Sequence, residues 1–538
     1  MNGTAYLRHP LTLLTAVSLI VGLVWYVLGL PVQMPRSPLT AGEKFGCVSY
    51  APAALWEEEQ ADIPLARIEA EVAALARHAS CVRTYRTGLG LDRVVDVAAT
   101  HGLKVLVGLT FGPDSAENRG EIERAIVLAE MQRDTITAFV AGDRVLSTRS
   151  LRASELTEII QELRRRTKLP VATAELPDTW LAADQLAAAV DLILLRVPLY
   201  DARFPSAAAD AAATAVADRA AIAAAYPGKE VVVETGWPST GRMREAALPA
   251  PSTQARVVHD LLAAARGGRF KLVLFEGIDN PARAFRMGTA AAHWGLLSSP
   301  SAPQKFQLGG TVLNHPLWFT QGATGIMLAL VIFAAGFLGV RSAGPHAAQS
   351  AKWGAVACIA LGASPFVGLA IADLPIQSHS IGEWLLGSAL VVLALVAPPV
   401  CAAAVIRQMP FEGFGSLLDP SIRRHVHPLS RAAGTLFTLT VFVALALGLT
   451  LVFDPEGREL PFAPLTGPAV AFLVLSLASP PGLRNDSKAE KAAALVLAAS
   501  AALTVFNESL WNWQAVWLAV LLFALAWACR RAPAARSS

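Results

Sequence analysis

Long apolar segments constrain this chain more than any other feature of its sequence. The first is residues 11–30, LTLLTAVSLIVGLVWYVLGL, and after about 280 residues without another such run a closely spaced series begins at Leu317. A helix that crosses a bilayer needs about 20 mostly apolar residues. We therefore expect an N-terminal membrane helix and seven more in the second half of the chain. The seven are residues 317–340, 353–373, 383–405, 432–453, 462–480, 491–507 and 512–529.

The composition agrees with this interpretation. Charged residues make up only 16% of the chain, against about 25% in an average soluble protein. Residues 11–30 exceed the apolar core of a signal peptide and lack a small-residue cleavage site, which favours an uncleaved anchor over a cleaved signal.

The basic residues between the apolar runs predict the topology, because cytoplasmic loops are enriched in Lys and Arg. Alternate loops and the C-terminal tail carry nearly all of them, whereas the opposite loops hold little more than Arg458. The sequence thus predicts cytoplasmic termini and a long segment between the first two membrane helices on the other side. In a bacterial chain this is a multi-pass inner-membrane protein with a periplasmic domain, in contact with membrane lipid. The basic residues are Arg341, Lys352, Arg407, Arg423, Arg424, Arg431, Arg484, Lys488, Lys491, Arg530, Arg531 and Arg536.

The long middle segment alternates short β-rich runs with amphipathic helical patterns such as ARIEAEVAALARHA. Such alternation predicts a parallel sheet, and eight units in about 275 residues fit a (β/α)8 TIM barrel. The fold class is thus α/β plus an α-helical membrane bundle. The domains are an anchor (1–36), a barrel (37–313) and a seven-helix membrane domain (314–538). The predicted strands are residues 44–50, 80–85, 103–109, 136–142, 169–175, 191–197, 230–236 and 270–277.

Ionisable and aromatic side chains gather where the predicted strands end. In a TIM barrel the chemistry lies at the C-terminal ends of the strands. Carboxylates and arginines can hold sugar hydroxyls and aromatic rings can stack on sugar faces, so this set indicates a carbohydrate site. Its members are Tyr50, Arg83, Tyr85, Asp143, Arg144, Glu175, Arg196, Tyr200, Glu234, Trp237, Glu276 and Asp279.

Other ligand classes receive no support from the sequence. The net charge is only +3 and no basic patch with interleaved aromatics is present, so we expect no nucleic-acid partner. None of the five cysteines forms a CxxC motif, and we expect neither a metal site nor a cofactor. Cys47 and Cys81 lie on neighbouring predicted strands, where a disulfide would be compatible with an oxidising compartment. Two buried free thiols are the favoured interpretation.

Several stretches of the middle segment resemble glycoside hydrolase family 17, the β-1,3-glucanase family of (β/α)8 barrels, over roughly residues 45–300. The resemblance rests on GCVSYAP (46–52), CVRTY (81–85), HGLKVLVGL (101–109), NRGEIERAI (118–126), VVVETGWPS (231–239), FEGIDNP (275–281) and HWGLL (293–297). The membrane layout, with one anchor before a barrel and seven helices after it, also resembles that of the rhizobial proteins called β-(1,6)-glucan synthases.

The family resemblance implies a retaining mechanism with Glu234 as the nucleophile. A retaining pair needs a second carboxyl about 5–5.5 Å away. In the family this is a Glu in a VGNEVL-like stretch, whereas the chain has AGDRVL at residues 141–146. Asp143 stands at the Asn position and Arg144 at the Glu position. An arginine stays protonated and is a poor acid or base.

Three explanations of this departure remain open. Asp143 takes over the proton transfer, a carboxylate from another strand (Glu175 or Glu276) does so, or the site binds glucan without cleaving it. The leading prediction is a β-1,3-glucan transglycosylase that forms β-1,6 linkages, with a β-1,3-glucanase and a non-catalytic glucan-binding partner of a membrane glucan synthase as alternatives. The predicted substrate-binding residues are Tyr50, Arg83, Tyr85, Arg144, Arg196, Tyr200, Trp237 and Asp279.

Overall fold

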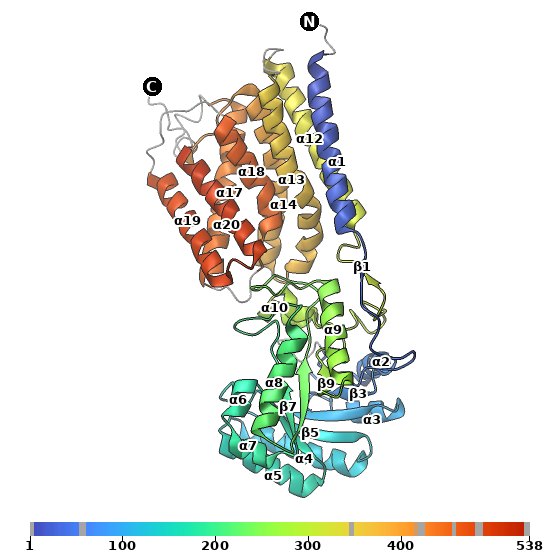
Figure 1. The fold of residues 1–538 in the computed structure, drawn as a ribbon. Coiled ribbons are helices and arrows are strands. Elements are labelled where there is room, and N and C mark those ends of the chain that lie inside the picture. Colours follow the sequence, from blue (N-terminus) through green and yellow to red (C-terminus); the bar gives the residue numbers. More distant parts are fainter. Residues whose placement is uncertain are drawn as a thin grey trace. The chain divides into compact units, whose positions relative to one another are not determined.

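The computed structural model describes residues 5–52, 61–343, 349–414, 417, 426–453, 459–478 and 488–531. The chain divides into two compact units (Figure 1). One is Pro31–Val312, and the other is formed by the chain before and after it.

Eight parallel strands of the unit Pro31–Val312 close into a barrel in sequence order, which confirms the predicted TIM-barrel fold. Every strand pairs with the strands that precede and follow it, and the last pairs with the first. The strands are β2 (Cys47–Ser49), β3 (Cys81–Arg83), β4 (Lys104–Leu109), β5 (Ile136–Asp143), β6 (Val171–Glu175), β7 (Leu192–Arg196), β8 (Glu230–Thr235) and β9 (Lys271–Leu274).

Helices follow the strands and cover the outside of the barrel. Two of these helices have recognisable N-terminal signals. The Asp114 side chain caps the first turn of α4, and Pro251 is the first residue of α9, where a backbone N–H would have no partner within the helix. The helices are α2 (Leu65–Ala76), α3 (Arg93–Thr100), α4 (Ser115–Met131), α5 (Ala153–Thr167), α6 (Pro177–Leu181), α7 (Asp184–Ala189), α8 (Ala211–Ala225), α9 (Pro251–Arg266), α10 (Ala284–Met287) and α11 (Thr289–Ala292), with the 3-10 turn η2 (Pro281–Arg283).

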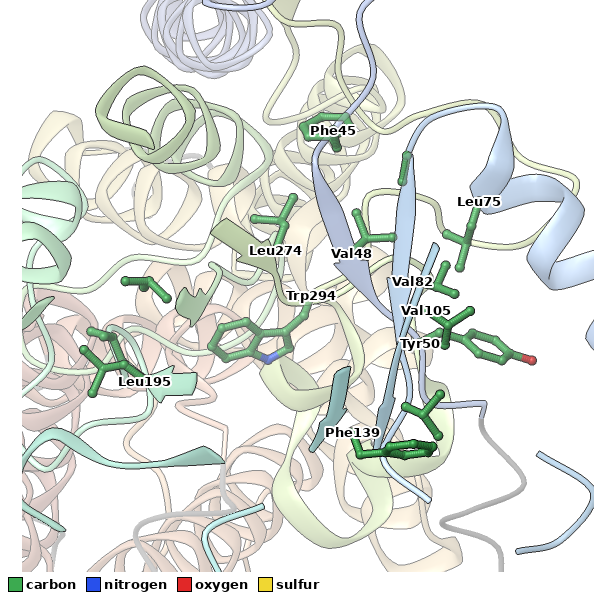
Figure 2. Close-up of a cluster of buried hydrophobic side chains, with 14 of the residues drawn as sticks. Phe45, Val48, Tyr50, Leu75, Val82, Val105, Phe139, Leu195, Leu274 and Trp294 are labelled. Carbon is green, nitrogen blue, oxygen red and sulfur yellow. The ribbon is translucent and has the colours of Figure 1, made fainter. Parts of the chain in front are cut away.

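Strand residues alternate between two buried layers, as the pleat requires. Val48, Val82 and Val105 face outward and share the larger apolar cluster with Leu75 of α2 (Figure 2). The alternate positions fill the barrel interior with small and aliphatic side chains. That interior cluster contains Cys47, Leu106, Ala138, Val140, Ala172, Ala174, Leu194, Val232 and Val273.

Cys47 and Cys81 form a disulfide, so the expectation of free thiols is wrong. Val48 pairs with Val82 in the parallel register, which brings the two preceding cysteines beside each other with 4.3 Å between their Cα atoms. Both side chains belong to the interior layer. The disulfide therefore links β2 to β3 inside the barrel.

A short antiparallel ribbon lies where the chain enters and leaves the barrel unit. Val32 of β1 (Val32–Gln33) pairs with Val312 of β10 (Thr311–Val312). The Gln33 amide donates to the carbonyls of Gly309 and Gly310. The two ends of the unit are thus fastened side by side.

The second unit is helical. Within the described residues, seven helices are long and apolar enough to cross a membrane, which supports a multi-pass membrane protein. The predicted run 462–480 also forms an apolar helix, but at 17 residues it is shorter than the others. The helices are α1 (Ala5–Leu28), α12 (Trp318–Ala343), α13 (Ser350–Gln377), α14 (Ile381–Arg407), α17 (Pro428–Phe453), α18 (Phe462–Ala478), α19 (Lys488–Glu508) and α20 (Trp513–Arg531).

The first helix packs within this helical unit. Trp25 is buried, its indole N–H donates to the carbonyl of Pro365 in α13, and Gly322 of α12 leaves room for its ring. Some residues used to predict orientation, namely Arg423, Arg424, Arg458, Arg484 and Arg536, lie outside the described residues.

Candidate functional site

Glu234 lies on β8 and lines a pocket at the C-terminal end of the barrel. Its side chain is buried, and its Oε1 accepts hydrogen bonds from the Tyr85 hydroxyl at 2.6 Å and from Arg196 at 3.0 Å. Among the described residues no donor makes a hydrogen bond to Oε2, which lies 3.4 Å from Nε of Arg83. Oε1 is thus held by two hydrogen bonds, whereas Oε2 is buried and makes only the longer ion pair with Arg83.

The supports of Glu234 come from neighbouring strand ends. Arg196 of β7 is directly paired with Glu234 in the sheet register, and Arg83 ends β3. The Arg83 guanidinium stacks 3.6 Å above the Tyr85 ring. Burial and the Glu234 carboxylate raise the pKa of Tyr85, so its hydroxyl remains a neutral donor.

Asp143 does not line the pocket itself, but a bulge in β5 brings it to Arg83 and Arg196, the arginines that also contact Glu234. Val140 pairs with Ala172 but Asp143 pairs with Ala174, so three steps along β5 match two along β6. Gly142 supplies the positive φ of 84° at this point. The extra residue reverses the alternation, as bulges do, and turns Asp143 to the interior side.

Arginines surround the Asp143 carboxylate. Arg83 donates to Oδ2 at 2.7 Å, Arg196 lies 3.8 Å from Oδ2, and Nε of Arg144 lies 3.5 Å from Oδ1. Burial alone would raise the pKa of Asp143, but Arg196, Arg83 and Arg144 outweigh it and hold the pKa below its usual value. Asp143 is therefore an ionised group, suited to accept a proton and poorly suited to donate one.

Arg144 and Glu234 both line the pocket. Its backbone has a φ of +55°, its N–H donates to the Ala174 carbonyl, and its side chain is 42% exposed. A guanidinium thus occupies the place where the family resemblance led us to look for a carboxyl.

The structure does not bring Glu175 into the pocket. Glu175 pairs with Leu195, which belongs to the outer layer, and its carboxylate accepts from the backbone N–H groups of Leu146 and Ser147. It fastens the loop after β5 from outside the barrel. Its prediction as the alternative acid/base does not fit this placement, because residue 175 has the opposite strand parity to the interior-facing Ala174.

Glu276 is also engaged elsewhere. Its two oxygens form a bidentate ion pair with Arg283 at 2.8 and 2.9 Å, and the side chain is buried. Burial raises the pKa of Glu276 to about 7, against the opposing effect of Arg283. That pKa suits an acid/base, but the carboxyl is held by Arg283 and is absent from the pocket lining.

Three predicted aromatic contacts have other roles. Trp237 is 0% exposed and donates its indole N–H to the Leu248 carbonyl, so it cannot serve as a sugar platform as predicted. Tyr50 is buried and donates to Glu71 of α2, and its hydroxyl points away from the strands in Figure 2. Tyr200 is buried and donates to the Arg242 carbonyl. These three side chains are therefore packed inside the barrel unit and do not line the pocket.

Trp294 and Phe275 are the aromatic residues that line the pocket, and strand-end reasoning missed both. Trp294 packs edge-on against Phe275 and Tyr200, with ring centroids 5.2 and 6.0 Å apart. Trp294 lies on no strand, and its only signal was the HWGLL stretch. The pocket lining comprises Arg144, Leu176, Arg196, Val197, Pro198, Asp201, Glu234, Thr235, Gly236, Phe275 and Trp294.

Asp279, predicted to bind substrate, organises a loop. Its Oδ1 accepts from the Lys305 ammonium at 2.7 Å and from the Gly295 N–H at 2.8 Å, and His293 lies 3.3 Å from Oδ2. Asp279 thereby positions the segment that carries Trp294. In the described part of the chain, no group of three or more His, Cys, Asp or Glu side chains could hold a metal ion.

The closed barrel and its buried, hydrogen-bonded carboxylate at the strand ends are features of glycoside hydrolase domains. Residues 47–295 match the family model of the BtgE/BtgC glycoside hydrolase domain, so the barrel resembles the domains of that family.

Two curated relatives match part of the barrel. The chain is 29% identical over 200 residues to the probable β-glucosidase btgE of Aspergillus clavatus, covering 35% of each protein. It is 26% identical over 193 residues to the protein of the same name from Emericella nidulans, covering 34% of each. The match therefore spans about a third of the length of these relatives.

Solved structures with a similar barrel have low sequence identity to this chain. A β-1,3-glucanosyltransferase mutant of Rhizomucor miehei in complex with laminaritriose is 16% identical, with a TM-score of 0.44, covering 49% of this chain and 97% of that one. An endo-laminarinase from Formosa is 16% identical, with a TM-score of 0.42, covering 47% and 82%.

Proposed function

We propose that the chain is a membrane-anchored β-glucan transglycosylase that uses β-1,3-glucan as the donor and forms β-1,6 linkages by a retaining mechanism. The observation that carries the proposal is the buried Glu234 carboxylate, held at Oε1 by Tyr85 and Arg196 and paired at Oε2 with Arg83, while the same two arginines engage the ionised Asp143. The loop charges favour a periplasmic barrel in a bacterial inner membrane, and the resemblance to rhizobial glucan synthases remains a prediction.

The reaction would proceed in two steps. Glu234 attacks the anomeric carbon, the glycosidic bond breaks, and the departing glucan oxygen takes a proton from solvent water. An acceptor hydroxyl then attacks the glucosyl ester, gives its proton to Asp143 and regenerates the Glu234 carboxylate. Asp143 returns the proton to the solvent, which restores the starting state. Asp143 is ionised beforehand, so the structure provides better for the second step than for the first. An acceptor sugar can stack on Trp294 or Phe275, whereas water cannot, and this favours transfer.

The test is to incubate the purified full-length protein with β-1,3-gluco-oligosaccharides and to determine the size and linkage of the products. Longer products with 1,6 bonds support the transferase. Shorter products alone would favour the β-1,3-glucanase. Glu234→Gln is the matched control, because it keeps the size of the side chain and removes the nucleophilic carboxylate.

A non-catalytic glucan-binding protein is the second candidate. It is favoured by Arg144 at the expected acid position and by the arginines that engage Asp143. Its partner would be a membrane glucan synthase. A 2-fluoro-glucosyl donor with a good leaving group distinguishes this candidate. A mass increase of one fluoroglucosyl group on the wild type but not on Glu234→Gln supports the enzyme, and oligosaccharide binding without any adduct or product supports the binding protein.

A further inference from the structure

Large apolar side chains are exposed on the loops at the C-terminal end of the barrel. Phe204, in the loop after β7, is 76% exposed. Phe285 and Met287, on α10 after β9, are 61% and 50% exposed. Scattered apolar residues are ordinary on a protein surface, but these three occur on two loops that leave the same end of one barrel.

Both loops are built to hold these side chains outward. Ser206 N–H donates to the Leu199 carbonyl at 2.9 Å, which closes the loop and leaves Phe204 near its tip. The α10 turn is anchored by the buried Ala284 and by the ion pair of Arg283 with Glu276 just before it. The backbone that carries the exposed side chains is therefore held in place in both loops.

Exposed arginines accompany the exposed apolar groups. Arg203 precedes Phe204 and lies with its guanidinium 5.4 Å from the ring centroid, and Arg286 separates Phe285 from Met287. Phe and Met combined with Arg are typical of surfaces that insert apolar groups at the acyl boundary while Arg contacts anionic headgroups.

The chain also leaves the barrel unit toward this end. α9 runs from the loop after β8, at the mouth, to the start of β9, at the opposite end. The carbonyl of Arg36 contacts His259 midway along α9, and the carbonyl of Pro38 accepts from Arg266 at its last residue. Residues 36–38 therefore follow α9 away from the mouth, and the β1–β10 ribbon that precedes them lies toward the mouth.

Short chain segments connect the ribbon to the two neighbouring apolar helices. Leu28 ends α1 four residues before Val32, and Trp318 begins α12 six residues after Val312. At about 3.3–3.6 Å per extended residue, these connections reach at most about 14 Å and 22 Å. The ribbon on the mouth side of the barrel unit is therefore joined to the apolar helices by two short connections.

We infer that Phe204, Phe285 and Met287, with Arg203 and Arg286, form a docking rim that rests on the surface of an anionic lipid bilayer. The pocket of Glu234 would then open at the lipid surface and receive chains that leave the membrane. This inference does not depend on the chemistry proposed above, because it uses only the rim and the two short connections.

The experiment uses full-length protein in nanodiscs, in a Cys358→Ser background that removes the exposed free cysteine. Phe204→Cys and Phe285→Cys are labelled separately with an environment-sensitive dye. Met131→Cys is the matched control, because Met131 is 69% exposed and ends α4 at the opposite end of the barrel. Quenching is measured with lipids that carry a spin label near the headgroup and with a water-soluble quencher.

Docking predicts that lipid quenching at positions 204 and 285 exceeds that at position 131 at least about twofold in phosphatidylglycerol nanodiscs. It also predicts a decrease in phosphatidylcholine or with the Arg203→Gln/Arg286→Gln pair, because the headgroup attraction is lost. Equal lipid quenching at all three positions overturns the inference. Protection from the aqueous quencher without lipid quenching also overturns it, because the rim is then covered by protein. Protection that appears only with added glucan identifies a sugar surface and overturns it too.

Discussion

Replacing Arg144 by glutamate tests most directly why this site departs from its family. Arg144 lines the pocket, as Glu234 does, and is 42% exposed. If the missing proton donor limits the reaction, Arg144→Glu should accelerate it, which is an unusual outcome for a change in an active site. General acid–base help is typically worth about 10²–10⁴ in rate, and we expect a gain of about 10²-fold on unactivated oligosaccharides.

The charge effect can be separated from the new carboxyl. Nε of Arg144 is 3.5 Å from Oδ1 of Asp143. Because Arg144 is substantially exposed, a water-like dielectric applies, and the attraction is about 1.2 kcal/mol. Arg144→Gln should therefore raise the pKa of Asp143 and shift the pH profile to higher pH, without supplying an acid. Arg144→Glu removes the attraction, adds a repulsion of similar size and supplies the acid.

The assay compares two donors. Initial rates are measured on a β-1,3-gluco-oligosaccharide, whose leaving group needs a proton, and on a dinitrophenyl glucoside, whose leaving group does not. Arg144→Glu should raise the first rate and change the second by less than about threefold. An equal gain on both donors, or no gain in a folded variant that still binds oligosaccharide, would refute the assignment of position 144 as the missing acid.

Three further outcomes follow from the described contacts. Tyr85→Phe removes the 2.6 Å hydrogen bond to Glu234, worth about 1.5–3 kcal/mol for a charged acceptor, and should lower kcat/KM on oligosaccharides by about 10–100-fold without loss of binding. Replacing both Cys47 and Cys81 by alanine removes a link between residues 34 positions apart and should lower the free energy of unfolding of the barrel by about 4 kcal/mol. Reducing the wild type with a thiol should lower its denaturant midpoint to that of this variant. Because the pKa of Glu276 is raised to about 7, the folded state binds more protons than the unfolded state between about pH 4.5 and 7. The free energy of unfolding should therefore fall as the pH rises through that window, and Glu276→Gln should flatten this dependence. An unchanged slope in the variant would contradict the effect of burial on Glu276.

The sequence predicted the strands well because each strand of this closed barrel is apolar on both faces and is followed by polar residues, which makes a recognisable pattern. Seven of the eight predicted runs contain a strand of the barrel, and the eighth, 136–142, ends one residue before β5 does. The direction of the terminal side chains was harder to predict. Glu175 and Glu234 both end β-rich runs, yet Glu234 faces inward and Glu175 faces the helices.

Two features of the site had no simple signal in the sequence. The bulge that turns Asp143 inward depends on the register of β5 against β6, and a glycine alone does not specify it. Trp237 and Trp294 both follow strand ends within family-like motifs, but only the packing of the loops decides that Trp237 is buried and Trp294 lines the pocket. The disulfide was misjudged for a related reason, since the β2–β3 register decides whether the two thiols meet.

The charge balance of the site indicates which half of the proposed reaction limits its rate. Three guanidinium groups (Arg83, Arg144 and Arg196) face two carboxylates (Asp143 and Glu234). When Glu234 becomes an ester its charge disappears, and the arginines then act on Asp143 alone, which holds Asp143 ionised until the acceptor hydroxyl transfers its proton to it. The first step gains no such help, because Glu276, the carboxyl whose pKa burial raises to about 7, is absent from the pocket lining. Formation of the glucosyl-enzyme should therefore limit turnover on natural glucan, with no burst of product. A donor that needs no protonation should restore a burst, and a burst on unactivated glucan would show that another group donates the proton.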